Sequence, residues 1–258
     1  MRLRFPSWVL AFAIVFLYAP LAILSFYSFN AASGDAWTGF SLRWYRELFG
    51  NSPDLWRSFG NTVLIALGAG AFATLLGTAG AIGMRWTRSR LRKLIEGLSF
   101  LPMVTPEIII GVSLLLLFAG LGVPLSLFTV FLAHVTFCLP FTWLIVTARL
   151  QEFDASVLEA ARDLGANEWQ TLVRVILPIA RPGILSAFLM AVTLSMEDFV
   201  ITFFVSGPGS STLAVHVYGM MRLGVTPVIN ALSVLLLAGT VVLAYFTRRM
   251  VANLGRNG

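Results

Sequence analysis

Residues 154–181 read DASVLEAARDLGANEWQTLVRVILPIAR, and this stretch decides how the rest of the chain is organised. Ser156 and Glu159 have the S-x-x-E spacing of a capping box, which predicts the start of a helix. Gly165 favours a left-handed helix end, and Asn167 can cap a second short helix. The pattern predicts a helix, a tight turn and a second helix.

This hairpin, residues 154–178, is too polar to cross a membrane, yet it carries an apolar stripe. Val157, Ala161 and Leu164 recur at helical spacing and share one helix face. Such a stripe has to be buried against another surface. A partner protein, the chain's own helix bundle and the lipid interface are all open as that surface.

The composition of the whole chain points to lipid as its outer solvent. Of its 258 residues, 58% are hydrophobic and only 12% are charged, about half of the roughly 25% charged residues in soluble domains. This balance excludes an ordinary soluble domain, a disordered chain and a collagen. Cys138 is the only cysteine, so no intrachain disulfide can form.

Apolar runs of membrane-spanning length predict six helices, because backbone groups in lipid must be paired within the chain. The runs lie at residues 8–29, 62–84, 97–119, 126–148, 183–205 and 229–247. Arg2 and Arg4 precede the first run as they would in a secretory signal, but the run is longer than a signal core. A cleaved signal is the alternative for this run alone. We therefore expect an all-α membrane protein that forms one domain over residues 1–258.

The basic residues predict the orientation of the helices. Lysine and arginine concentrate before the first run, after the second, fourth and sixth, and are scarce elsewhere. Cytoplasmic flanks carry this excess, so both termini and the 154–178 hairpin are expected in the cytoplasm. Topology and interfacial lipid account for the net charge of +6, and no nucleic-acid partner is needed to explain it.

The hairpin also resembles a known family signature. Glu159, Ala160 and Ala161, then Gly165, then residues 175–178 (VILP) resemble the EAA signature of binding-protein-dependent ABC-transporter permeases, with valine for the usual isoleucine at 175. The resemblance implies the type I importer architecture, in which this coupling helix docks on a separate ATPase. It implies coupling roles for six residues: Glu159, Ala160, Ala161, Leu164, Gly165 and Pro178.

The same resemblance implies the partners. ATP and Mg²⁺ would be bound by an ATPase subunit dimer, and this chain would bind no cofactor. Its only lysine, Lys93, does not lie in a phosphate-binding loop. A second permease subunit would complete the pathway, and residues 40–49 and 207–227 would receive a solute-binding protein outside or else lie on the bundle as lids. The chain shows neither H-E-x-x-H nor G-x-S-x-G, so an enzyme is not indicated. A stand-alone channel or carrier would leave the hairpin unexplained.

Further stretches resemble the spermidine/putrescine branch of these permeases, and the second, C-type subunit in particular. They lie at residues 39–45, 106–107, 134–141, 195–198 and 224–231. The resemblance implies import of polyamines across the inner membrane of a bacterium. Permeases for ferric iron, sulfate or molybdate share the hairpin and are the alternative.

Three carboxylates inside the apolar runs support a cationic cargo. Glu107, Glu197 and Asp198 lie in runs that contain no lysine or arginine, and an ionisable group at this depth marks a pathway by default. Neighbouring helix positions point about 100° apart, so Glu197 and Asp198 cannot both face one pore, and we expect Asp198 to do so. Trp143 and Phe203 could supply aromatic faces for an ammonium group.

Structural roles are the alternative for each of these residues. Glu107 could cap the helix after Pro106, and Asp198 or Glu197 could pair with His134 or with the partner permease. The aromatic residues could be packing. His134 is expected to be a satisfied core residue, since no metal-ligand spacing accompanies it. Pro102 and Pro106 lie one turn apart and predict a broken or bent helix at the start of the third run.

Overall fold

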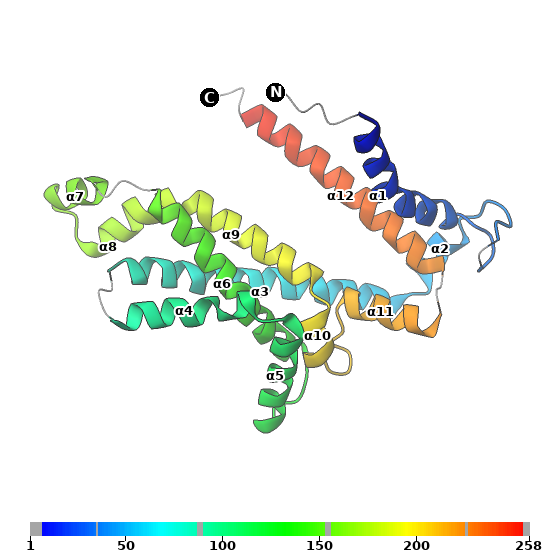
Figure 1. The fold of residues 1–258 in the computed structure, drawn as a ribbon, viewed down its shortest axis with the longest axis horizontal. Helices are drawn as coiled ribbons and strands as arrows, with labels where there is room; N and C mark the ends of the chain where they lie inside the picture. Colours follow the sequence, from blue (N-terminus) through cyan, green and yellow to red (C-terminus); the bar gives the residue numbers. More distant parts are fainter. Residues whose placement is uncertain (1–6, 35, 87–89, 153–155, 225–226, 255–258) are drawn as a thin grey trace. The chain divides into compact units, whose positions relative to one another are not determined.

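The structure is a computed structural model that describes residues 7–34, 36–86, 90–152, 156–224 and 227–254. Its elements are almost entirely helical (Figure 1). They are α1 (Ser7–Tyr27), α2 (Arg43–Gly50), α3 (Pro53–Trp86), α4 (Arg90–Val104), α5 (Glu107–Gly120), α6 (Leu127–Gln151), α7 (Ser156–Asp163), α8 (Glu168–Thr171), a π-helical turn (Leu172–Ile176), α9 (Leu177–Glu197), α10 (Val200–Val205), α11 (Leu213–Leu223) and α12 (Pro227–Leu254).

Six apolar helical segments correspond to the six predicted runs. Four are long and apolar enough to cross a membrane: Trp8–Tyr27, Pro53–Met84, Leu127–Gln151 and Glu168–Glu197. Two shorter apolar helices are Glu107–Gly120 and Pro227–Val242. The predicted all-α membrane fold is confirmed.

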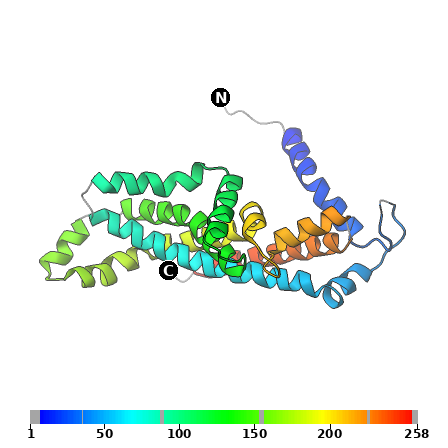
Figure 2. The same ribbon diagram turned by 90° about the horizontal axis from the view of Figure 1, so that it is seen from below.

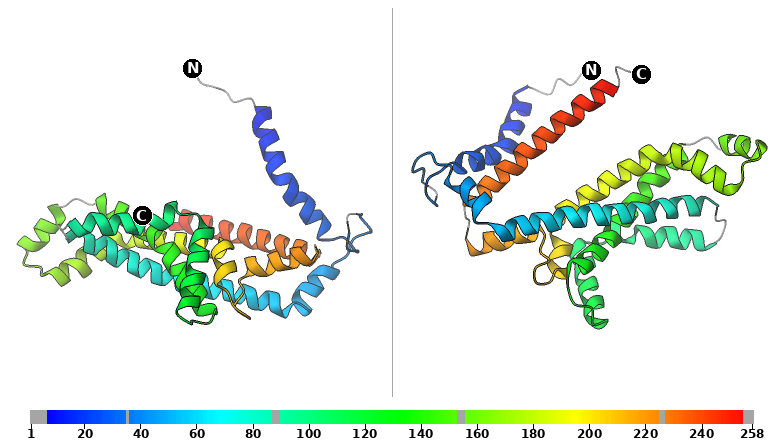
Figure 3. Two further views of the ribbon diagram at one scale, coloured as in Figure 1. Left: turned by 60° about the horizontal axis from the view of Figure 1, so that its bottom comes forward. Right: turned by 180° about the vertical axis from the view of Figure 1, so that it is seen from behind.

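The chain forms two compact units, and the first comprises Met1–Asp54 together with Val217–Gly258. In this unit α12 packs against both α1 and α2 (Figure 3). The loop between α1 and α2 is held by Asn30, whose side-chain oxygen accepts from the Thr38 N–H at 2.8 Å and whose Nδ2 donates to the Ala36 carbonyl at 2.8 Å. Trp44 Nε1 donates to the Asn30 carbonyl at 2.7 Å, which anchors α2 to this loop.

The second unit is Leu55–His216 and contains the broken helices and the hairpin. Here α6 packs along α9, and α10 packs against α5 and α6 (Figure 2). One buried cluster surrounds Phe118, Phe137 and Ile201, and a second surrounds Trp143 and Ile176. The helices of this unit therefore share a core in which every apolar run from the second to the fifth takes part.

Two of the six runs are interrupted. The third divides into α4, which ends at Val104, and α5, which begins at Glu107. Pro106 breaks the helix here because its ring clashes with the preceding turn and it has no N–H to donate. The break predicted at the start of the third run is confirmed. The fifth run divides into α9 and α10 at Asp198, a break that the sequence reasoning did not predict.

The helices α3 and α6 cross at a glycine contact. A Cβ atom built on Gly77 would lie 2.8 Å from the backbone nitrogen of Trp143 and would collide with the Thr142 hydroxyl. That hydroxyl donates to the Ala73 carbonyl at 2.9 Å across the crossing. Close approach of the two backbones therefore depends on the missing side chain at Gly77.

We expect Gly77→Ala to lower the thermal unfolding midpoint of the purified chain. Overpacking of this kind costs about 1–3 kcal/mol, which outweighs the gain of about 1 kcal/mol from placing alanine in a helix. Gly83→Ala in the same helix is the control, because nothing lies within 4 Å of the added Cβ. A midpoint for Gly77→Ala that equals or exceeds the midpoint for Gly83→Ala would contradict the packing argument.

Candidate functional site

Asp198 lies at the break between α9 and α10 and closes it with its side chain. Its Oδ1 accepts from the Ile201 N–H at 3.2 Å, and its Oδ2 accepts from the Thr202 N–H at 2.9 Å and the Thr202 hydroxyl at 2.7 Å. These are backbone donors of the first turn of α10, which have no partner within that helix. The Asp198 side chain is 1% exposed, so its carboxylate pairs the first N–H groups of α10 inside the protein.

His134 of α6 joins the same buried network. Its Nε2 lies 3.2 Å from Asp198 Oδ2 and 2.8 Å from Thr202 Oγ1, and its Nδ1 lies 2.6 Å from Ser195 Oγ. The imidazole is fully buried. His134 is thus a satisfied core histidine, as expected from the sequence, and it ties α6 to both sides of the break.

One protonation pattern satisfies every group in this network. The Thr202 hydroxyl donates to Asp198, so Thr202 Oγ1 is free to accept from a proton on His134 Nε2. Nδ1 then accepts from the Ser195 hydroxyl. Because both carboxylate oxygens of Asp198 accept hydrogen bonds from Ile201 or Thr202, this carboxylate is occupied with holding the fold together.

Glu197 and Glu107 are placed differently from Asp198. Both are exposed, and neither has a hydrogen bond or ion pair within the described part of the chain. Glu197 is the last residue of α9 and Glu107 the first of α5, so each lies beside a helix break. Pro106 makes no side-chain cap to α5, and the proposed cap from Glu107 is likewise not seen.

The helix that begins with Glu107, α5, packs against α10, the helix that follows Glu197 across the second break. Gly111, one turn after Glu107, faces α10: a Cβ atom at Gly111 would lie 2.8 Å from Phe204 Cδ2 and 3.3 Å from Ile201 Cα. Ile201 follows Glu197 by four residues along the chain. The two helix breaks therefore lie on neighbouring elements of one unit.

The two aromatic candidates differ in accessibility. Trp143 is 8% exposed and belongs to the buried cluster with Ile176, where its ring covers Gly80. Phe203 on α10 is 44% exposed, and its ring centroid lies 5.7 Å from that of Phe199 and 5.5 Å from that of Phe204. The pathway roles of these residues stay predictions, with Phe203 the more accessible.

The hairpin has the predicted helix, turn and helix. At the end of α7 the Ala166 N–H donates to the Ala161 carbonyl at 3.0 Å and the Gly165 N–H to the Arg162 carbonyl at 2.8 Å, which together form a Schellman turn. Gly165 has φ +80°, the conformation that favours glycine. Asn167 Oδ1 caps α8 by accepting from the Gln170 N–H at 2.8 Å. Residues 154 and 155, at the start of the predicted hairpin, lie outside the described residues.

The apolar stripe of the hairpin is divided between buried and exposed positions. Ala161 is buried and Leu158 packs on the cluster around Trp143, whereas Leu164 is 88% exposed. Trp169 on α8 is 71% exposed. Of the predicted stripe, Ala161 is thus buried while Val157 and Leu164 are exposed, and the surface that covers the exposed positions stays a prediction.

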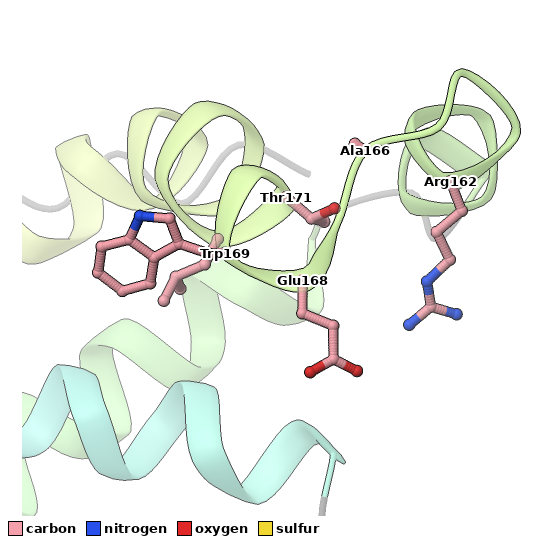
Figure 4. A pocket seen from close by; sticks show the side chains of 6 residues that line it. Arg162, Ala166, Glu168, Trp169 and Thr171 are labelled. Atoms are coloured by element: carbon pink, nitrogen blue, oxygen red, sulfur yellow. The ribbon is translucent and has the colours of Figure 1, made fainter.

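A hollow of about 680 Å³ opens between α7 and α8 beside these exposed side chains. It is lined by Arg162, Ala166, Glu168, Trp169, Thr171 and Leu172 (Figure 4). Arg162 and Glu168 bring opposite charges to it, and Trp169 supplies its largest apolar face. The sequence reasoning did not single out Trp169, although a tryptophan in a short polar segment is a signal for a contact surface.

The coupling residues of the EAA resemblance lie on α7, in the turn that follows it and at the start of α9. Glu159 and Ala160 are exposed on α7, and Pro178 is exposed in the first turn of α9. The π-helical turn Leu172–Ile176 leads directly into α9, so the hairpin joins α9 without an intervening loop.

Sequence comparison places the chain among transport permeases. The family model described as "Binding-protein-dependent transport system inner membrane component" matches residues 73–256. The spermidine/putrescine transport system permease protein PotC of Escherichia coli K12 is 38% identical over 229 residues, which are 88% of this chain and 86% of PotC. The putrescine transport system permease protein PotI of the same organism is 39% identical over 252 residues, 95% of this chain and 89% of PotI.

Solved structures share the fold at low sequence identity. A bacterial ABC transporter for the import of alginate matches with a TM-score of 0.75 at 16% identity, covering 94% of this chain and 91% of that chain. The MetNI methionine ABC transporter, in an inward-facing conformation, matches with a TM-score of 0.64 at 21% identity, covering 75% and 92%. These structures show that the fold is shared, and the family model together with the relatives PotC and PotI establishes that the chain belongs to the family of binding-protein-dependent transport system inner membrane components.

Proposed function

We propose that this chain is one of two permease subunits of an ATP-driven importer of polyamines such as spermidine and putrescine. It spans the inner membrane of a bacterium as a single permease domain, with both termini in the cytoplasm. A separate ATPase dimer binds ATP and Mg²⁺ and docks on the hairpin. A solute-binding protein delivers the polyamine to the outer face. The chain itself carries out no chemical catalysis and binds no cofactor.

The observation that carries the proposal is the pair of exposed glutamates at two adjoining helix breaks. Glu107 and Glu197 lie in apolar helical runs, exposed and without a cationic partner in the described residues. A carboxylate at membrane depth is costly unless it is paired, and a polyamine supplies ammonium groups that pair with it. The polyamine cargo of the relatives PotC and PotI agrees with this charge.

Within the pathway we assign different roles to the neighbouring acids. Glu197 and Glu107 bind the ammonium groups, and Phe203 offers an aromatic face for a cation–π contact. Asp198 is a positioning residue that holds the α9–α10 break and so directs Glu197 away from the core. Trp143 supports the pathway from the core behind it. This assignment moves the main binding role from Asp198, which the sequence favoured, to Glu197.

Another solute is the alternative cargo. Sulfate and molybdate are anions and would be repelled by unpaired glutamates, whereas a ferric ion would be attracted to them. The test is ATP hydrolysis by the transporter reconstituted with its second permease, its ATPase and its binding protein. We expect stimulation by spermidine or putrescine and none by sulfate, molybdate or ferric iron. Stimulation by one of these three and not by polyamines would overturn the assignment of the cargo.

The hairpin supports the proposed coupling. Leu164, Trp169 and the hollow between α7 and α8 form an accessible surface with an apolar centre and charges of both signs at its edge. An exposed tryptophan that becomes buried when a partner binds contributes strongly to protein–protein binding. We propose that the ATPase covers this surface together with the exposed Glu159 and Ala160 of α7, and that the buried Ala161 holds α7 in place beneath it.

We expect Glu197→Gln to raise the polyamine concentration needed for half-maximal uptake. Loss of a charge-assisted contact corresponds to roughly a tenfold to hundredfold change, and Glu107→Gln should have the same direction. Uptake of labelled putrescine by proteoliposomes measures this effect. Glu152→Gln is the control, since that exposed carboxylate pairs with Arg149 at 2.8 Å. Unchanged uptake in both pathway variants would exclude these glutamates from the binding role.

We expect Asp198→Asn to weaken uptake for a different reason. An amide has one acceptor oxygen in place of two, so a backbone donor of α10 loses its partner at a cost of about 1–3 kcal/mol. The thermal unfolding midpoint should therefore fall in Asp198→Asn and stay unchanged in Glu197→Gln. A variant with normal stability, normal assembly and lost uptake would instead place Asp198 in direct contact with the polyamine.

We expect Trp169→Ala and Leu164→Ser to reduce association with the ATPase without lowering the stability of the permease. Both side chains are largely exposed, so their removal costs little folding energy. Co-purification of the ATPase and polyamine-stimulated ATP hydrolysis measure the effect. Trp8→Ala is the matched control, because Trp8 is 72% exposed but lies on α1. Gly165→Asp should uncouple transport by distorting the same turn, and normal ATPase association in all three hairpin variants would count against the coupling role.

A further inference from the structure

A groove of about 530 Å³ runs between α3 and α9 in the second unit. Most of its lining is aliphatic or aromatic, with Leu75 from α3 and Ile184, Leu185 and Phe188 from α9. Its volume lies within the range of about 300–1,000 Å³ that is typical of sites for small ligands. The groove involves neither the His134 network nor the hairpin hollow.

Two threonine hydroxyls beneath this apolar lining have no hydrogen-bond partner in the described structure. Thr74 and Thr78 follow each other by one turn of α3, are 5% and 8% exposed, and both line the groove. A buried hydroxyl without a partner costs about 1–3 kcal/mol. Threonine in a helix has two accessible χ1 settings, so a change of rotamer can turn either hydroxyl toward an acceptor in the groove.

Arg181 lies at one end of the groove. It is exposed in the first part of α9 and makes no ion pair within the described residues. Arg149, at the end of α6, differs in this respect because Glu152 neutralises it at 2.8 Å. The groove therefore carries a positive charge at Arg181, two hydroxyl donors at Thr74 and Thr78, and otherwise apolar side chains.

We propose that this groove binds an anionic phospholipid, with the phosphate at Arg181 and an acyl chain along Leu75, Ile184 and Phe188. An acyl chain matches the apolar lining, ester oxygens can accept from Thr74 or Thr78, and a phosphate complements the unpaired guanidinium. Arg181 belongs to the basic flank expected at the cytoplasmic leaflet, where anionic lipids bind basic pockets between helices. A polyamine does not suit the groove, because its ammonium groups would meet Arg181.

The test is labelling of the assembled transporter in phosphatidylcholine vesicles that contain a photoactivatable phosphatidylglycerol. We expect the label on α3 and α9, with an apparent affinity about fivefold lower in Arg181→Gln, the effect of one basic residue near an anionic membrane surface. Leu185→Trp should also reduce labelling, because it fills the groove without a change in charge. Arg174→Gln is the control, since Arg174 is exposed on the π-helical turn and does not line the groove.

Several results would overturn the proposal. One is labelling of α3 and α9 in Arg181→Gln and Leu185→Trp that equals labelling of the wild type. A second is competition by soluble glycerol phosphate as effective as competition by phosphatidylglycerol, which would indicate a site for free phosphate. A third is crosslinking of a Leu185→Cys variant to the second permease subunit with no lipid labelling, which would show that protein covers the groove.

Discussion

The structure depends on one constraint, that a helix interrupted inside lipid must find partners for its freed backbone groups within the protein. At the α9–α10 break, Asp198 accepts from the N–H groups of Ile201 and Thr202, and His134 closes the network from α6. An unpaired buried amide would cost several kcal/mol in hydrocarbon. The break is tolerated because a neighbouring helix and a carboxylate replace the bonds that the missing turn would have made.

The same break allows two adjacent acids to do different things. In a continuous helix Glu197 and Asp198 would be separated by a rotation of about 100°, and both would still belong to one regular surface. Because α9 ends between them, Asp198 turns into the core with an extended backbone (ψ 123°) while Glu197 stays outside. The α4–α5 break does the equivalent for Glu107 by a simpler route, since Pro106 has no N–H that would need an acceptor. Each exposed glutamate is thus a by-product of how its helix ends.

The sequence predicted the helices and the hairpin well because those features follow from local patterns. An apolar run, Gly165 and Asn167 each determine the structure of only a few neighbouring residues. Pro106 likewise predicts a helix break at its own position. The α9–α10 break was missed because the run from Gly183 to Val205 is predominantly apolar and holds no proline or glycine after its start. It depends on His134 and Ser195, which lie 61 residues apart in the chain. The spacing of Ser195, Asp198 and Thr202 is a signal that could have indicated a polar cluster, but not that Asp198 would be buried and Glu197 exposed.

The π-helical turn at Leu172–Ile176 connects the hairpin to α9 without a loop. A π turn contains one residue more than an α turn, so everything before it is rotated by about 100° relative to an uninterrupted helix. The direction in which Trp169 faces is therefore set by the number of residues in this turn rather than by any one side chain. A substitution at 172–176 keeps the number of residues in this turn, whereas a single insertion or deletion would rotate the whole hairpin relative to α9.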